Sequence, residues 1–187
     1  AAGVPEELMP EVKLGDEFLM SSLFTASEVA LAQRGGAALE RPARNVVVGG
    51  LGLGYTARAA LAHVGLHELL VIEALAAVIG WHERGILPLA TTLTDDPRCR
   101  LINADFFALA ADAAIGFDSN TPGRRFDAIL LDIDHAPDQL LHPAHATFYT
   151  ATGLRCLASH LVADGVFALW SDAPPAADFT SLLGDVF

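Results

Sequence analysis

Four acidic side chains stand just after short apolar runs of the sequence. Glu73 and Asp105 each follow one such run, and the pair Asp132 and Asp134 follows a third. The carboxyl ends of parallel strands line one crevice, so we expect these carboxylates to share a ligand site. Carboxylates accept hydrogen bonds from sugar hydroxyls and amino groups, and they can take a proton from an amine that is about to react.

A glycine-rich turn precedes these acids and predicts close contact between a ligand and the backbone. Four glycines follow the apolar run Val46–Val48, namely Gly49, Gly50, Gly52 and Gly54. The dinucleotide fingerprint G-x-G-x-x-G is incomplete, because Tyr55 stands at the place of its last glycine. This spacing favours a nucleoside without a pyrophosphate. Glu73, about 20 residues after the turn, stands where a carboxylate accepts ribose hydroxyls, and Asp105 is a candidate acceptor for the exocyclic amine of an adenine.

Short apolar runs alternate with amphipathic stretches and predict a parallel, doubly wound α/β sheet with helices between its strands. The expected strands are Asn45–Val48, Glu68–Ile72, Arg100–Asn103, Asp127–Leu131 and Val166–Trp170. The expected helices are Tyr55–His63, Ala74–Arg84, Phe106–Ile115 and Ala146–His160, with a last one starting over Phe179–Leu183. At the amino-terminal end, Glu11–Met20 alternates around Gly15-Asp16 and predicts a hairpin. We therefore expect a hairpin with a linking helix over residues 1–40 and a ligand-binding α/β domain over residues 41–187.

The composition excludes several classes of protein. The chain has 187 residues, of which 52% are hydrophobic, so it has enough apolar surface to form a core and is not disordered. No stretch reaches the ~18 apolar residues of a spanning helix, so we expect no membrane association. A net charge of −12 repels phosphate backbones and argues against a nucleic acid partner. Cys99 and Cys156 form no CxxC motif, which favours reduced thiols and a cytoplasmic location.

Three histidines, His135, His142 and His145, follow the Asp132–Asp134 segment. A metal site would need a second carboxylate at matched spacing, and Pro143 favours the start of a helix between the last two histidines. We interpret all three as loop side chains over the crevice, with His135 placed to contact substrate and no metal bound.

Two other motifs are given structural interpretations. Trp81-His82 is placed on a helix surface at the edge of the core, and Arg124-Arg125 is placed in a solvated loop.

Most of the chain, from about Val12 to Trp170, resembles the spermidine synthase (polyamine aminopropyltransferase) family, a branch of the Rossmann-like S-adenosylmethionine-dependent transferases. The similar motifs are Val71-Ile72-Glu73, Val78-Ile79-Gly80-Trp81-His82, Leu87-Pro88, the stretch from Asp95 to Phe107, Phe126–Asp132 and the aromatic pair Phe148-Tyr149. The segment from Leu14 to Glu28 resembles the connection between the family's small β domain and its core. The resemblance implies a Rossmann-like sheet of the class I methyltransferase type.

The resemblance also implies an adenosyl ligand and a role for each acid. The ligand would be S-adenosylmethionine or its decarboxylated form, with methylthioadenosine as a product, and the four glycines would lie against the nucleoside and its tail. Glu73 would hold the ribose and Asp105 the adenine. Asp132 would be the general base for the acceptor amine, with Asp134 and His135 as further catalytic candidates.

Two departures from the family pattern change the expected function. The family usually has an Asp at the place of Gly52, where it pairs with the aminopropyl ammonium, and a small hydroxyl residue at the place of Ile133. We therefore predict a spermidine synthase-like transferase that binds an adenosyl ligand and a small amine acceptor without efficient putrescine aminopropylation. The alternatives are an S-adenosylmethionine-dependent methyltransferase and a catalytically silent nucleoside-binding or dimerisation module. The resemblance, together with an uncovered sheet edge, also predicts a homodimer.

Overall fold

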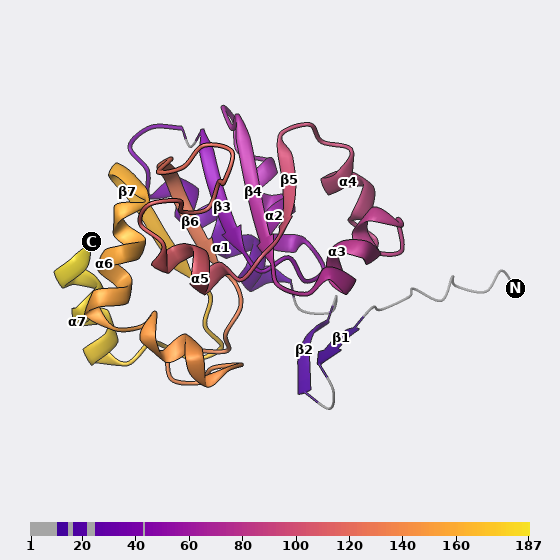
Figure 1. Ribbon diagram of the computed structural model, residues 1–187. Helices are drawn as coiled ribbons and strands as arrows, with labels where there is room; N and C mark the ends of the chain where they lie inside the picture. Colours follow the sequence, from indigo (N-terminus) through magenta and orange to yellow (C-terminus); the bar gives the residue numbers. More distant parts are fainter. Residues whose placement is uncertain (1–10, 15–16, 22–24, 43) are drawn as a thin grey trace, which may run out of the picture.

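Five parallel strands form the central sheet of this computed structural model, which describes residues 11–14, 17–21, 25–42 and 44–187. The spatial order is β5-β4-β3-β6-β7 (Figure 1). The strands are β3 (Asn45–Gly49), β4 (Glu68–Glu73), β5 (Cys99–Asn103), β6 (Phe126–Leu131) and β7 (Leu161–Leu169). The chain builds outward from β3 to β5 and then crosses back to β6. The strand order therefore reverses between β3 and β6, where open α/β sheets place their ligands.

Helices cover both faces of this sheet. One face packs against α1 (Ala26–Ala37), α2 (Tyr55–Leu61), α3 (Ala76–Glu83) and α4 (Ala90–Thr94), and the other packs against α5 (Phe106–Ala111), α6 (Ala151–Ser159) and α7 (Ala177–Val186). Successive side chains of a strand point to opposite faces, so Val46 and Val48 belong to the first core and Val47 to the second. The predicted doubly wound, Rossmann-like α/β class is confirmed.

The amino-terminal hairpin also forms. β1 (Glu11–Leu14) pairs antiparallel with β2 (Glu17–Ser21) in a two-stranded sheet of its own. The turn residues Gly15-Asp16 lie outside the described residues. Helix α1, which follows, contributes Leu31 and Ala32 to the first core of the large sheet. The division of the chain into two domains stays a prediction.

The element bounds differ most from the sequence predictions in three places. Helix α4 was not predicted. The expected helix Ala146–His160 is a 3₁₀ helix, Pro143–Thr147, followed by α6, because the Thr150 side chain accepts a hydrogen bond from Gly153 N and starts a new helix. Strand β7 begins at Leu161 rather than Val166. Its register against β6 shifts near Asp164, which has a φ of 60°. Because of this irregularity, the sequence pattern does not predict the first half of the strand.

Candidate ligand site

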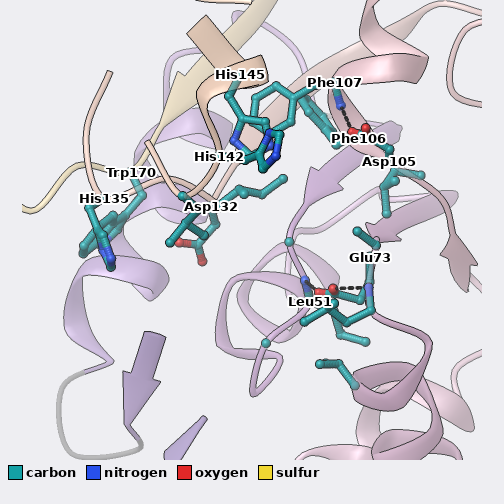
Figure 2. A pocket seen from close by; sticks show the side chains of 18 of the residues that line it. Leu51, Glu73, Asp105, Phe106, Phe107, Asp132, His135, His142, His145 and Trp170 are labelled. Carbon is teal, nitrogen blue, oxygen red and sulfur yellow. Dashed lines mark hydrogen bonds between the residues drawn. The ribbon is translucent and has the colours of Figure 1, made fainter. Parts of the chain in front are cut away.

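A cavity of about 440 Å³ opens where the strands end. Its wall is built from the segments that follow β3, β4, β5 and β6, together with Trp170 after β7 and Glu28 from α1 (Figure 2). The volume lies within the range of small-molecule sites. Of the residues predicted for the site, the lining includes Gly50, Gly52, Glu73, Asp105, Asp132 and His135. Gly49, Gly54 and Asp134 are not part of the lining.

The glycine turn lies directly against the segment after β6. Asp132 N donates to Gly49 O at 2.8 Å, and Gly50 N donates to Ile72 O at 2.9 Å. Gly50 has a φ of 92°, and a Cβ there would lie 2.0 Å from the carbonyl oxygen of Asp132. Only glycine fits this position against the segment after β6, and Gly50 also lines the cavity. Gly54 has a φ of 90° and is the N-cap of α2.

Glu73 is held by two backbone groups from different segments. Its Oε2 accepts from Leu51 N at 3.0 Å, and its Oε1 accepts from Leu75 N at 2.8 Å (Figure 2). These bonds join the glycine turn to the start of α3. Each carboxylate oxygen keeps further acceptor capacity, so Glu73 can also accept hydrogen bonds from a ligand in a fixed orientation.

Asp105 is the N-cap of α5. Its Oδ1 accepts from Phe107 N at 2.8 Å and from Ala108 N at 3.3 Å, while Oδ2 has no bond to the described residues (Figure 2). The side chain is exposed and lines the cavity. Asp105 therefore combines a structural role with one oxygen available to a donor group of a ligand.

Asp132 lies deeper in the wall. Its Oδ2 accepts from the Thr56 hydroxyl at 2.6 Å. Burial raises its pKa to about 6, the bond from Thr56 opposes this rise, and the Glu28 carboxylate adds to it. A carboxylate with a pKa near the working pH is suited to accept a proton from an amine.

Asp134 faces the loop that follows it instead of the cavity. The residue is 3% exposed, and its carboxylate accepts from Leu141 N at 2.8 Å, His145 Nδ1 at 2.8 Å and the Tyr149 hydroxyl at 2.9 Å. Because a carboxylate only accepts, the hydrogen of the His145 ring lies on Nδ1. Burial and the adjacent carboxylate raise the pKa of Tyr149, which stays a neutral donor. Asp134 thus anchors the loop and is not part of the cavity lining.

The anchored loop gives the cavity an aromatic wall. The ring of His145 stacks on Phe107, with centroids 3.9 Å apart and planes inclined by 23°. His142 lies next to it, at a centroid distance of 5.8 Å, and both histidines line the cavity. His145 belongs to the 3₁₀ helix Pro143–Thr147 and not to a loop, and His142 is the N-cap of that helix. Within the described residues, no three His, Cys, Asp or Glu side chains gather as a metal site.

His82 of α3 forms a hydrogen bond to the glycine turn. Its Nε2 lies 2.9 Å from Gly52 O, which can only accept, so Nε2 carries the hydrogen, and the buried Nδ1 is an acceptor without a partner among the described residues. Burial lowers the pKa of His82. The prediction that Trp81-His82 lies at the surface and core edge was wrong for His82, which is 0% exposed. The signal was present in the sequence, because position 82 continues the apolar stripe of Val78 and Ile79.

The sequence predictions did not include three further residues of the site. Glu28 and Thr56 are buried and meet Asp132 from α1 and α2, and Trp170 lines the cavity from the end of β7. No local motif identifies these residues, because α1 and α2 come close to β6 only in the folded structure.

A search of the described residues for membrane-spanning helices found no helix of sufficient length and hydrophobicity.

Comparisons with known proteins place the fold. No family model matches the chain, and no curated protein matches it in sequence. Among solved structures, a spermidine synthase bound to the transition-state analogue AdoDATO matches with a TM-score of 0.69 and 20% identity over 91% of this chain and 55% of that one. The spermidine synthase from Thermotoga maritima matches with a TM-score of 0.66 and 20% identity, over 91% and 53%. The chain thus spans about half the length of these proteins. It has a spermidine synthase-like, Rossmann-like fold.

Proposed function

We propose that this chain is a spermidine synthase-like transferase that binds an adenosyl sulfonium and forms methylthioadenosine as a product of the transfer. The observation that carries the proposal is the Glu73 carboxylate, fixed between Leu51 N and Leu75 N at the cavity wall. A carboxylate oriented in this way can accept two vicinal hydroxyls of a ribose, as in other nucleoside sites of this sheet type. The likeness to solved spermidine synthases supports the same assignment.

The residues around the cavity fit the rest of an adenosyl group. Oδ2 of Asp105 is available to the exocyclic amine of a purine, and Phe107 and His145 offer flat rings beside it. Gly50 and Gly52 of the glycine turn line the other end of the cavity. The volume of about 440 Å³ is sufficient for a nucleoside with a short tail.

The chemistry would be the transfer of an alkyl group to an amine. A bound sulfonium supplies an electrophilic carbon and a neutral thioether as the leaving group. Asp132 would accept the proton that the acceptor amine loses as it forms its new bond to carbon. Its pKa of about 6 leaves it mostly ionised at neutral pH and therefore ready to act as the base. Thr56, bonded to Oδ2, would fix the orientation of that carboxylate.

Efficient aminopropylation of putrescine is not part of the proposal. Gly52 contributes no anion to the glycine turn, and Ile133 lines the cavity where the resemblance expects a hydroxyl. An ammonium in a partly dry site is unfavourable without a counter-charge. Gly52 also favours the second candidate, a methyltransferase, because a methionine carboxylate would meet no acid at that position.

Calorimetric titration with methylthioadenosine tests adenosyl binding. Glu73→Ala and Asp105→Ala should each weaken binding roughly ten- to a hundredfold, because each removes a hydrogen bond to a charged group. Asp112→Ala is the matched control, since Asp112 caps a backbone turn in the same way as Asp105 but does not line the cavity. If the wild type binds no adenosyl ligand, the proposal is wrong and a silent module is favoured. If both site variants bind it unchanged, the placement of the ligand at Glu73 and Asp105 is wrong.

A further inference from the structure

The segments after β6 and β7 contribute one acid, Asp132, to the described lining of the cavity. The neighbouring Asp134 is not part of this lining, because its oxygens already accept three hydrogen bonds from its own loop. Figure 2 shows Asp132 with Trp170 on one side of the cavity and Glu73 with Asp105 on the other. The second side is the one that we assign to the ribose and the base. The first side is therefore left for the acceptor.

Apolar side chains make up much of this acceptor side. Ile133, Leu141 and Trp170 all line the cavity. Cγ1 of Ile133 lies only 3.2 Å from the position that a Cβ would take at Gly50, so this side chain packs beside the glycine turn. Trp170 N donates to Leu131 O at 2.8 Å, and the Trp170 side chain packs partly against the first core. The Trp170 ring is thus a fixed apolar surface at the cavity wall.

The negative charge on this side is confined to one corner. Glu28, the remaining acid of the described lining, lies beside Asp132. The Thr56 hydroxyl that donates to Asp132 Oδ2 is 3.4 Å from the backbone oxygen of Glu28, and the Glu28 charge contributes to the raised pKa of Asp132. Two adjacent carboxylates can meet one amine, but they offer no second, separate anion to the far end of a diamine.

The histidines of the lining supply neutral polar groups instead of a second anion. Nδ1 of His142 accepts from Ala144 N at 3.2 Å, so the hydrogen of a neutral His142 ring lies on Nε2. His145 lies next to it and donates through Nδ1 to Asp134. A second ammonium on the acceptor would therefore meet apolar groups or imidazoles, which is unfavourable in a partly dry site.

Building on the proposed function, we infer that the acceptor is a monoamine with an aromatic body, an arylalkylamine, and not an aliphatic diamine. Its amine would lie at Asp132, and its ring would pack against Trp170 and Ile133, where an aromatic pair adds to the burial of apolar surface. In the transfer, the amine nitrogen forms a bond to the carbon of the adenosyl sulfonium. The carbon–sulfur bond breaks, its electron pair stays on sulfur as a neutral thioether, and Asp132 accepts the proton from nitrogen.

Calorimetric titration of the methylthioadenosine complex with phenethylamine and with putrescine tests the acceptor class. Wild type should bind phenethylamine roughly tenfold or more tightly than putrescine, because only the aryl amine can cover the Trp170 ring. Trp170→Ala should abolish most of this preference. Trp81→Ala, which removes a half-buried Trp outside the cavity, is the matched control and should keep it. Ile133→Asp adds a second carboxylate to the apolar side and should shift the preference toward putrescine.

The outcomes separate the two proposals. If methylthioadenosine does not bind wild type, the proposed function fails. If it binds, but phenethylamine binds no more tightly than putrescine or neither amine binds, the acceptor class is wrong. A preference that survives both Trp170→Ala and Ile133→Asp would also overturn the inference, since the apolar wall would not be its cause. The wild-type comparison needs no substitution, so it stays decisive if Ile133→Asp fails to fold.

Discussion

Asp132 gives the folded chain a specific dependence on pH. Its pKa is about 6, above the ordinary value of 3.8, mainly because the side chain is buried and further because Glu28 is near. The folded state therefore binds this proton more tightly than the unfolded chain does. The stability that results is fully present below pH 3.8 and is lost as the pH rises through about 6.

Asp132→Asn should therefore stabilise the protein at pH 7.5 and have little effect near pH 4. The gain should be on the order of 2–3 kcal/mol, because a pKa shift of one unit corresponds to about 1.4 kcal/mol. Asn keeps an oxygen for the Thr56 hydroxyl. Urea unfolding at several pH values measures the difference, with the exposed Asp138→Asn as the control. A gain that is equal at every pH would contradict this assignment.

The strand-end acids show what the sequence can predict about single residues. Glu73, Asp105 and Asp132 line the cavity, because the end of a parallel strand fixes the edge at which a residue lies. The direction of a side chain beyond that end is not fixed by any periodicity. Asp134 therefore turned into its own loop, although its sequence position differs from that of Asp132 by only two residues. Glu28 gave no local signal, since its neighbour Asp132 is far away in the chain.

The loop between β6 and α6 depends on one buried carboxylate. Asp134→Ala would leave three donors, from Leu141, His145 and Tyr149, without their acceptor. We expect a loss of about 3–5 kcal/mol in the free energy of unfolding. We also expect weaker methylthioadenosine binding, because this loop brings His145 to the cavity wall. Urea unfolding and calorimetry measure the two effects, and Asp138→Ala in the same loop is the control. An unchanged affinity would show that the loop does not contact the ligand.

Helix α3 supports the glycine turn through the hydrogen bond from His82 to Gly52 O. His82→Leu removes the donor to Gly52 O and leaves a buried acceptor, which should cost about 1–3 kcal/mol of stability. Methylthioadenosine affinity should fall as well, because the turn loses its support. His82→Gln retains an N–H donor and should restore part of both losses, whereas the exposed Glu83→Gln should change neither. Equal behaviour of the Leu and Gln variants would rule out the hydrogen bond as the cause.

At the level of helices and strands, the sequence predicts the regular elements and misses the irregular ones. The five strands were located from their continuous apolar runs, and β3, β4 and β6 are buried on both faces. Helix α4 has only five residues, too few to show a helical stripe. The split between Pro143–Thr147 and α6 depends on the close packing of Gly153, where a Cβ would lie 2.4 Å from Thr147 O. This contact and the Thr150 cap are local, but they leave no trace in the hydrophobic periodicity.

The ligand site and a polar cluster lie at opposite ends of the sheet. The cavity lies at the carboxyl ends of the strands, whereas Arg100 and Arg124 meet Glu68 and Asp118 near the amino ends of β4, β5 and β6. Arg124 also donates to Asn45 at the start of β3. The prediction that Arg124-Arg125 is a solvated loop was wrong for Arg124, because hydrophobicity alone does not reveal long-range ion pairs. This cluster joins four segments without touching the cavity.

Asp118→Asn should therefore lower stability and leave methylthioadenosine affinity unchanged within about twofold. Burial opposes the charge of Asp118, but the bonds from Arg100 and Arg124 outweigh it and hold the pKa below its ordinary value of 3.8. The resulting stability is present above pH 3.8 and is lost as the pH falls through the lower folded value. The variant should lose on the order of 3 kcal/mol at pH 7, and the difference should narrow only as the pH falls below about 4. Urea unfolding measures this difference against the exposed Asp95→Asn. A loss that is independent of pH, or a loss of affinity, would refute this separation of the two ends.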